Sequence, residues 1–568
     1  MTLWNEQVLL LVVALPGAVA VGIALVGLLT SVLGLPALPA AFWRGVGVAT
    51  AALDFGLALL GPLRRFDPEQ LGLQLVARVG WRDLEGLHWL LGLDGIGLCF
   101  LLVTTALVPL ALLASRAQLR ESARTEVALA LVLETALLGT IASANLLAFV
   151  FFWALSVLPI LVWVGRFGGE GRSAAASRIW ATESLALAAL LFVVFVLRDA
   201  SVTQLGRPVL DLATAGPIGG PAVPSLLDVF IDPADQTLLF VALGLALALR
   251  IPLVPLHFWL PAVHAAAPTP LSIVLATGFV QTAAIGLLRF GLPLLPDAAR
   301  AAGPSIAVLG IVALVYASLV ALVQKELRRL VAWSSIGYAG FAVFGIATLD
   351  IQGITGAVVQ LVTHGLATSA LFMLTGFLAT RRKTTEVVAF GGLAKPMPVC
   401  AFFFGLMTAS LMGLPLLGGF VGDLFVLLGS LGTRRELSLV ALVAMVVSAS
   451  YLLWVQRRVF LGPVDEPANR GLIDLDRVER FVMLAITVPI VAIGLYPNPL
   501  LRRIEPAVLE ILYEMDRRAL PEEGEPQDGP PPAEEGAVGG GVARRSDPPR
   551  AEAGVAWAIR APLAGVRR

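Results

Sequence analysis

Seven ionisable side chains lie within or beside long apolar runs of the sequence: Glu134, Glu183, Arg250, His257, His264, His364 and Asp423. A charge inside a bilayer is costly unless it is paired or hydrated, so each of these residues indicates a polar interior and a candidate functional position. Carboxyl and imidazole groups bind and release protons, whereas a guanidinium keeps its charge. The set therefore has the chemistry to pass protons through the inside of a membrane protein.

Most of these residues also have a purely structural interpretation. A mid-helix carboxyl or imidazole can hydrogen-bond a neighbouring helix, and a residue near a helix end can reach the membrane surface. The structural alternatives are a bond to a neighbouring helix for Glu134, exposure at the inner surface for Glu183, an ion pair for Arg250, a loop cap for His264 and packing for His364. Asp423 is the residue that a structural role explains least.

Helix-breaking residues surround two of the charges. Pro252 and Pro255 follow Arg250, and the segment 413–419 with its glycines and proline precedes Asp423. Backbone groups freed by such breaks are tolerated at membrane depth only where they face protein or water. Interrupted helices at corresponding positions in two halves of a chain are typical of transporters with inverted repeats. We therefore expect these charges to line an internal polar path.

The composition is that of a polytopic membrane protein. Of the 568 residues, 58% are hydrophobic and only 14% are charged, against roughly 25% charged in soluble domains. The formal net charge is zero, and no basic stripe with aromatic residues predicts binding of nucleic acid. The sequence has no P-loop, cysteine quartet or HExxH motif, so we expect no cofactor and no metal in this chain. Cys99 and Cys400 are interpreted as small buried apolar residues.

Apolar runs of membrane-spanning length occur fourteen times, which predicts an all-α membrane protein. They lie near 7–32, 41–61, 95–114, 126–143, 145–165, 180–197, 236–256, 271–292, 304–323, 330–348, 354–379, 398–428, 436–456 and 480–497. The longer connections, 62–94 and 198–235, have the composition of hairpins or short interfacial helices.

Basic residues gather in alternate connections between these runs. The richer set includes Arg116, Arg120 and Arg124, then Lys325, Arg328 and Arg329, then Arg381, Arg382 and Lys383, then Arg457 and Arg458. The positive-inside rule places these connections in the cytoplasm and both termini outside.

The pattern divides the chain into four parts. Residues 1–94 hold the first two spans, and residues 95–500 form a core with repeats near 126–292 and 304–456. Residues 501–520 place Ile504, Val508, Ile511, Leu512 and Met515 on one face of a helix, which predicts an interfacial amphipathic helix. Residues 521–568 are rich in Pro, Gly and Glu and are predicted to be disordered.

Several long motifs resemble the antiporter-like membrane subunits of respiratory complex I, the M type above all. They are "RIPLVPLHFWLPAVHAAAPT", "LVQKELRRLVAWSSIGYAGFAVFGI", "GAVVQLVTHGLATSALFMLTG", "FGGLAKPMPV" and "GLPLLGGFVGDLFVLLGS". The resemblance implies fourteen helices, inverted five-helix repeats, broken helices seven and twelve, and a central chain of charged groups that moves protons. It places family histidines at His257, His264 and His364, and the acidic group of helix twelve at Asp423.

Three positions depart from the family pattern that this resemblance implies. Ala154 stands in place of a glutamate, and Arg250 and Gln281 stand in place of lysines. Alanine and glutamine do not titrate, and arginine does not release its proton near neutral pH. Arg250 therefore needs another anion, and the candidates are Glu134 and Glu183.

The resemblance implies a membrane subunit of a proton-translocating NADH:quinone oxidoreductase, placed in the inner (cytoplasmic) cell membrane. Its partners would be other membrane subunits of a complex I-like assembly and the lipid bilayer. The chain would be part of an enzyme only within that assembly, with no redox centre of its own. The alternatives are a non-pumping scaffold that couples other subunits, a subunit of a cation/proton antiporter, and a subunit of a membrane hydrogenase.

Overall fold

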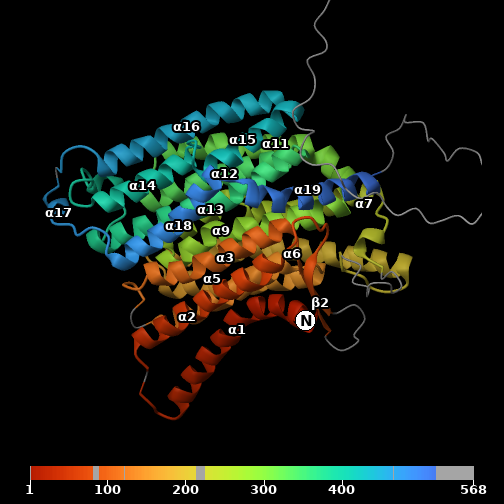
Figure 1. Cartoon of the computed structure of the whole chain (residues 1–568), viewed down its shortest axis with the longest axis horizontal. Coiled ribbons are helices and arrows are strands. Elements are labelled where there is room, and N and C mark those ends of the chain that lie inside the picture. The colour runs from red at the N-terminus through yellow and green to blue at the C-terminus, as the bar shows by residue number, and fades with distance from the viewer. Residues whose placement is uncertain are drawn as a thin grey trace, which may run out of the picture. The chain divides into compact units, whose positions relative to one another are not determined.

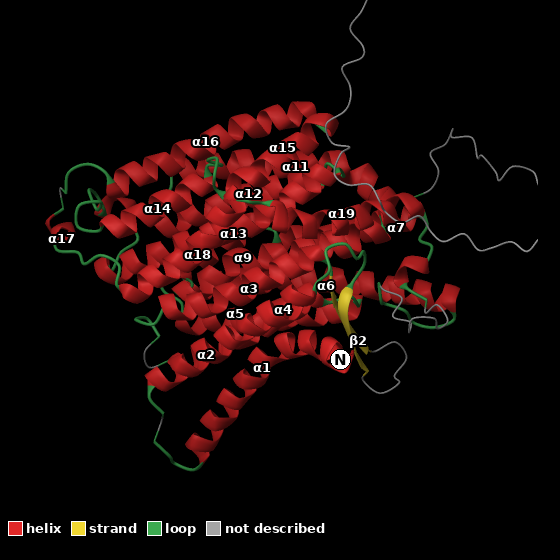
Figure 2. Ribbon diagram, viewed as in Figure 1, coloured by secondary structure: helices red, strands yellow, loops and turns green. Residues whose placement is uncertain are grey.

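A computed structural model describes residues 2–36, 38–80, 88–119, 122–212, 224–464 and 466–519. The regular secondary structure of the described chain is helical apart from one antiparallel hairpin, β1 (Gln74–Gly80) and β2 (His88–Leu93), drawn yellow in Figure 2. That hairpin falls in the connection 62–94, for which the composition left hairpins and short interfacial helices open. The predicted disordered tail, 521–568, lies outside the described residues.

The helices follow the predicted spans closely. They are α1 (Thr2–Val32), α2 (Ala40–Ala58), α3 (Gly95–Ala114), α4 (Ala123–Ala142), α5 (Leu146–Phe167), α6 (Arg172–Leu205), α7 (Pro233–Arg250), α8 (Leu260–Ala266), α9 (Thr269–Ile285), α10 (Leu292–Leu294), α11 (Pro296–Leu322), α12 (Leu327–Ile346), α13 (Ile351–Arg382), α14 (Pro398–Leu411), α15 (Gly418–Thr433), α16 (Arg435–Phe460), α17 (Pro467–Arg470), α18 (Arg477–Leu495) and α19 (Asn498–Arg518). Single turns of other helix types are η1 (Leu59–Leu63), η2 (Leu226–Asp228), η3 (Leu256–Trp259), η4 (Gly286–Gly291) and η5 (Val387–Ala389).

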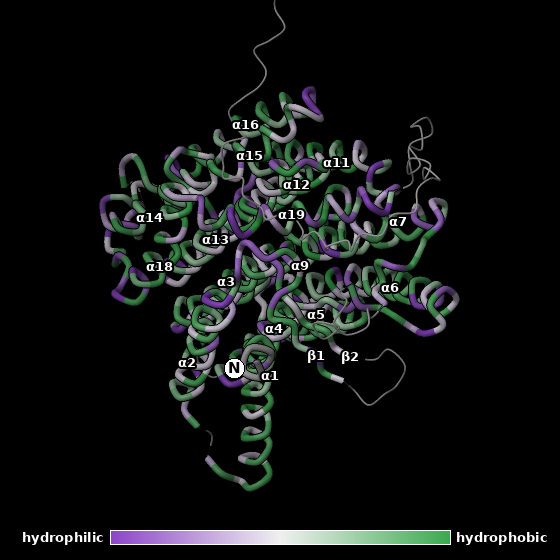
Figure 3. Tube along the Cα trace, turned by 45° about the vertical axis from the view of Figure 1, so that its right-hand side comes forward, coloured by the Kyte–Doolittle hydropathy of each residue, from purple (hydrophilic) through white to green (hydrophobic). Residues whose placement is uncertain are grey.

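Within the described residues, 13 helices are long and apolar enough to cross a membrane. The remaining predicted span, 398–428, consists of the two shorter apolar helices α14 and α15. The hydropathy colouring of Figure 3 shows the apolar stretches running along the helices. The prediction of an all-α polytopic membrane protein is confirmed, while the inverted symmetry of its halves stays a prediction.

Both predicted helix breaks are present. Helix α7 ends at Arg250, and the chain crosses Pro252 and Pro255 before η3 and α8. The indole N–H of Trp259 donates to the carbonyl of Leu249 at 2.8 Å, which satisfies a backbone acceptor left free at the end of α7. The second break separates Leu411, the last residue of α14, from the start of α15. Both interruptions therefore lie in the spans where prolines and glycines predicted them.

Helix α13 forms the centre of the described bundle. Its membrane-spanning stretch is entirely buried, and it packs against α9, α12, α14, α15 and α18. These helices surround α13 in Figure 1. Glycines bring α15 close to it, because a Cβ added at Gly422 would lie 2.8 Å from the backbone nitrogen of Gln360. The next residue, Asp423, is also buried inside the bundle.

The predicted apolar face of α19 is covered by protein. Ile504, Val508, Ile511 and Met515 are buried, Leu512 is partly buried, and α19 contacts α3, α10 and α13. The amphipathic helix is therefore confirmed as an element, and its location at the membrane surface stays a prediction.

Helix α19 is also tied to the hairpin region. The Glu510 carboxylate accepts a hydrogen bond from the backbone N–H of Gly72 at 2.8 Å. Burial raises the pKa of Glu510, and the hydrogen bond from Gly72 only partly opposes that effect. The carboxyl group thus binds its proton more readily than an exposed glutamate.

Gly95→Ala is expected to displace α19. A Cβ at Gly95 would overlap the backbone carbonyl of Arg503, and overpacking of this kind costs about 1–3 kcal/mol. We expect faster proteolysis within 503–518 and a lower midpoint of thermal unfolding. Gly56→Ala is the matched control, because a Cβ there meets open space. Equal behaviour of the two variants would contradict the docking of α19 on α3.

Candidate functional site

Arg250 is held in a buried ion pair with Glu183. The guanidinium Nη2 lies 2.7 Å from Glu183 Oε2, and the side chains are 0% and 1% exposed. The Nη2 group also donates to Ser156 Oγ at 3.1 Å and to the carbonyl of Trp153 at 3.3 Å. The hypothesis that Arg250 pairs with Glu134 or Glu183 is confirmed for Glu183, and the idea that Glu183 reaches the inner surface is wrong.

Two aromatic rings enclose the guanidinium. Its carbon lies 3.4 Å from the ring centroid of Trp153 and 4.2 Å from that of Phe279. The Trp153 indole N–H also donates to Glu183 at 3.1 Å. A flat, delocalised cation stacks on such rings better than an ammonium does. The cage therefore suits arginine in place of the lysine that the family resemblance implies.

Ala154 does not face this cage. Trp153 and Ser156 contact Arg250 from one side of α5, and Ala154 follows Trp153 by about 100° around the helix axis. Ala154 is only partly buried. The anion for Arg250 consequently comes from α6, a different helix from the one that the family pattern implies.

Gln281 of α9 extends the set of buried polar groups toward α13. It is fully buried, and its amide nitrogen donates to the carbonyl of Leu361 at 3.4 Å. Its amide oxygen has no donor among the described residues. One turn earlier on α9, Thr277 bonds the carbonyl of Gly365 at 3.0 Å and Ser369 at 2.9 Å. Helices α9 and α13 therefore share a seam of polar groups.

His364, Tyr338 and Asp423 form the far end of the buried polar set. His364 is 7% exposed and Asp423 is 3% exposed. The rings of His364 and Tyr338 lie 4.6 Å apart, and a nitrogen of His364 is 3.0 Å from the hydroxyl of Thr368. The Tyr338 hydroxyl donates to the carbonyl of Leu411 at the helix break and interacts electrostatically with Asp423.

The carboxyl group of Asp423, in the second turn of α15, lies beside the break between α14 and α15. Gly413 has a φ of +70°, and a Cβ at that position would lie 2.5 Å from Asp423 Oδ2. Neither carboxylate oxygen of Asp423 has a donor among the described residues. A buried carboxyl group beside a kinked backbone is a candidate functional position, because such groups are tolerated in a membrane interior only where protein or water meets them.

The two histidines after the first break, His257 and His264, have different surroundings. His257 is half-buried and its ring packs against Tyr316 and Trp333, with centroid distances of 5.5 and 5.1 Å. His264 is fully buried and stacks on Phe372 at 4.4 Å. Neither ring nitrogen of His264 has a partner among the described residues, so a role as a loop cap by hydrogen bonding is not seen.

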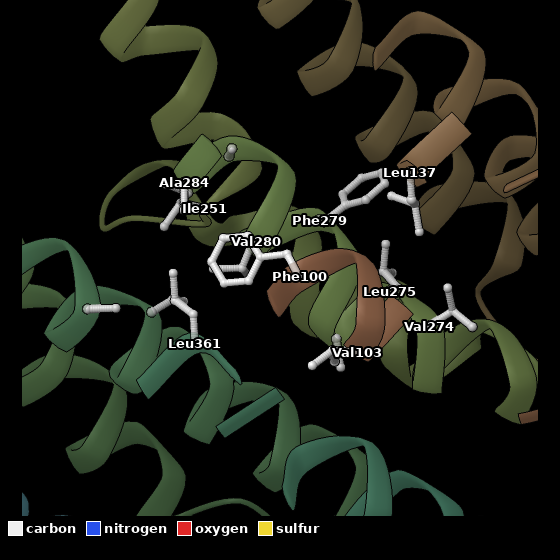
Figure 4. Close-up of a cluster of buried hydrophobic side chains, with 14 of the residues drawn as sticks. Phe100, Val103, Leu137, Ile251, Val274, Leu275, Phe279, Val280, Ala284 and Leu361 are labelled. Atoms are coloured by element: carbon white, nitrogen blue, oxygen red, sulfur yellow. The ribbon is translucent and has the colours of Figure 1, made fainter. Parts of the chain in front are cut away.

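Tightly packed apolar side chains flank the polar groups. Figure 4 shows Phe279 beside Leu137, and Ile251 beside Ala284, with Leu361 on the facing helix. All of these side chains are buried. The polar residues from Arg250 through Gln281 to His364 thus lie in an interior shielded from lipid, as the sequence predicted.

Sequence reasoning missed several polar residues of this interior. Tyr338 carries no charge and so has no signal in a pattern of charges, whereas Asp54 is a single acid within an apolar run. Arg289 was also missed: it lies in η4 and pairs with Asp94 at 2.7 Å. The signal for both Asp54 and Arg289 was the one used for the other seven, a charge within an apolar run.

Metal-ligating groups do not cluster in the described part of the chain. No three or more His, Cys, Asp or Glu side chains there could hold a metal ion. Cys99 and Cys400 are free thiols buried in the bundle, as predicted.

Comparison with known proteins agrees with these features. Residues 143–450 match the family model described as NADH:quinone oxidoreductase/Mrp antiporter, TM. The chain is 32% identical over 471 residues to NADH-quinone oxidoreductase subunit M of Rhodobacter capsulatus, a match that covers 83% of this chain and 90% of that one.

Solved structures share the fold. A chain of respiratory complex I from Thermus thermophilus superposes with a TM-score of 0.76 at 26% identity, covering 89% of this chain and 99% of that one. A chain of the Mrp complex from a Dietzia species has the same fold at 22% identity, with a TM-score of 0.71 over 89% of this chain and 52% of that one. The sequence match, the broken helices and the buried polar interior lead to one conclusion: the chain belongs to the NADH:quinone oxidoreductase/Mrp antiporter family.

Proposed function

We propose that this chain is the M-type membrane subunit of a proton-translocating NADH:quinone oxidoreductase in the cytoplasmic membrane. One observation carries the proposal: buried polar groups follow one another from Glu183 and Arg250 through Gln281 to His364 and Asp423. Protons would move along these groups, with redox chemistry left to other subunits of the assembly. Loop charge supports a placement with both termini outside.

Arg250 would act in this path as a fixed charge. Its proton is not released near neutral pH, and Glu183 neutralises its charge at 2.7 Å. The groups that exchange protons would then be Asp423 and His364 at one end of the path and the carboxyl group of Glu134 on α4 at the other. Gln281 would pass or orient protons through hydrogen bonds.

A non-pumping coupling subunit is the second candidate, and the locked Arg250–Glu183 pair is the observation that favours it. Arg250 does not release its proton near neutral pH. A path in which every proton had to bind to and leave Arg250 itself would therefore be closed at that position. The two candidates differ in their dependence on Asp423, which a scaffold does not need as an acid.

The test is proton transport by the assembled complex in sealed vesicles. We expect Asp423→Asn to reduce NADH-driven proton movement strongly, because asparagine cannot carry a proton at the break. Asp232→Asn is the matched control, since Asp232 is an exposed helix cap whose role asparagine also fills. Unchanged transport in both Asp423→Asn and Gln281→Lys would support the scaffold and overturn our proposal.

A further inference from the structure

Helices α2 and α4 bring two acidic residues to the same depth. Gly47 of α2 faces Val127 of α4, because a Cβ at Gly47 would lie 2.5 Å from the valine side chain. The two helices run parallel, since the single span α3 lies between them in the chain. Asp54 and Glu134 each follow that contact by seven residues, about two helical turns. Their carboxyl groups are close enough to interact electrostatically.

Both carboxyl groups are completely buried and have no hydrogen-bond donor among the described residues. Each residue is 0% exposed, and none of the four oxygens has a hydrogen-bond donor among the described residues. Two adjacent carboxylates in such surroundings would repel each other without any compensating contact. On α2, α4 and the elements that pack against them, the other charged side chains that the structure describes lie near helix ends. They are Arg44, Arg124, Glu126 and Arg166.

Two of these charged side chains, Arg44 and Glu126, bond to other groups, and Arg124 and Arg166 lie near the ends of α4 and α5. Arg44 donates to the carbonyl of Arg116 at 2.6 Å, and Glu126 accepts from Trp163 at 2.9 Å. None of them supplies a cation to Asp54 or Glu134. The arrangement is therefore stable only if the pair carries a proton.

The pair lies beside the central polar groups. Leu137, one turn after Glu134, contacts Gly278 of α9, where a Cβ would lie 2.6 Å from the leucine. Gly278 is one turn before Gln281 on the same helix. We propose that Asp54 and Glu134 form a second proton-binding site, in which the hydroxyl of one carboxyl group donates to the carboxylate of the other. The bound ligand is a proton, and its transfer between the two oxygens requires no further reactant.

The role of this site as a proton store beside the path rests on the proposed function, whereas the sharing of a proton does not. The test is infrared spectroscopy of the full-length protein in lipid nanodiscs, which needs no pumping. We expect the wild-type protein to show the carbonyl band of a buried protonated carboxyl group at neutral pH. Asp54→Asn should shift the band of Glu134, and Glu134→Gln should shift that of Asp54, because each change removes the shared hydrogen bond.

Glu126→Gln is the matched control, since Glu126 is a buried glutamate of the same helix with its own hydrogen bonds. It should leave the band of the pair unmoved. Three results would overturn the proposal: no protonated band from the pair at neutral pH, a surviving band that single variants leave unshifted, or a band that changes with sodium at constant pH, which indicates a metal cation. A wild-type complex that does not pump would sink the proposed function and leave this measurement unaffected.

Discussion

Glu183→Gln is expected to lower the free energy of unfolding by about 3–5 kcal/mol, because it leaves the charge of Arg250 buried without an anion. The guanidinium is 0% exposed, so water cannot replace the lost carboxylate without a rearrangement of the helices. The remaining contacts with Ser156 and the carbonyl of Trp153 are neutral. The measurement is chemical unfolding of the purified full-length protein, followed by tryptophan fluorescence.

A second variant separates a stranded charge from lost packing. In Glu183→Gln combined with Arg250→Met, no charge remains at this position, and methionine can still pack between Trp153 and Phe279. Removal of one partner of a buried ion pair is costly chiefly because the other charge is left without compensation, so we expect the double variant, which removes both charges, to recover most of the stability. Non-additivity of this kind is the measure of direct coupling.

Glu126→Gln serves as the control for removal of a buried carboxylate. Glu126 accepts hydrogen bonds from Ser122 and Trp163 and has no ion-pair partner among the described residues. Its loss should cost about 1–3 kcal/mol, the range for disturbed buried hydrogen bonds. If Glu183→Gln were as stable as the wild-type protein, Arg250 would have another anion or water, and the fixed-charge role would be wrong.

The predictability of this fold from sequence has a physical reason. Each bilayer crossing needs about 20 apolar residues, so the fourteen spans could be counted directly, and prolines and glycines marked both breaks. The ends of the helices were less predictable than their number. Helix α6 runs over Arg172–Leu205 instead of 180–197, because it extends at both ends beyond the apolar stretch that defines a span.

The side-chain partners could be predicted only as alternatives. Hydropathy indicates which charges are buried, whereas helix rotation decides which of them meet. For that reason the sequence left both Glu134 and Glu183 as anions for Arg250, and only the packing of α5, α6 and α7 selects Glu183. Tyr338 could not be found at all by a search for charges, because a neutral hydroxyl in an aromatic helix has no distinguishing pattern.

Gly419→Ala is expected to cost about 3 kcal/mol, the upper end of the usual range for overpacking. A Cβ at Gly419 would overlap the backbone carbonyl of Ser410 near the end of α14. Backbone atoms on both sides of the break would have to separate, whereas a flexible side chain could rotate away. The change of stability is measured by chemical unfolding of the full-length protein.

Gly432→Ala in the last turn of the same helix is the matched control. A Cβ there meets nothing within 4 Å, and alanine is favoured over glycine in a helix by roughly 0.5–1 kcal/mol. We therefore expect the two substitutions to have opposite signs. If Gly419→Ala were neutral or stabilising, the close approach of the two half-helices would not exist.

The same pair of variants tests whether the break itself positions the acid. Asp423 lies one turn after Gly419, so separation of α15 from Ser410 moves the carboxyl group away from Gly413 at the break. Gly419→Ala should then impair proton transport in the assembled complex, while Gly432→Ala should leave it unchanged. Because neither substitution alters a titratable group, a transport defect confined to Gly419→Ala would depend on the geometry of the interrupted helix and not on the loss of a proton carrier.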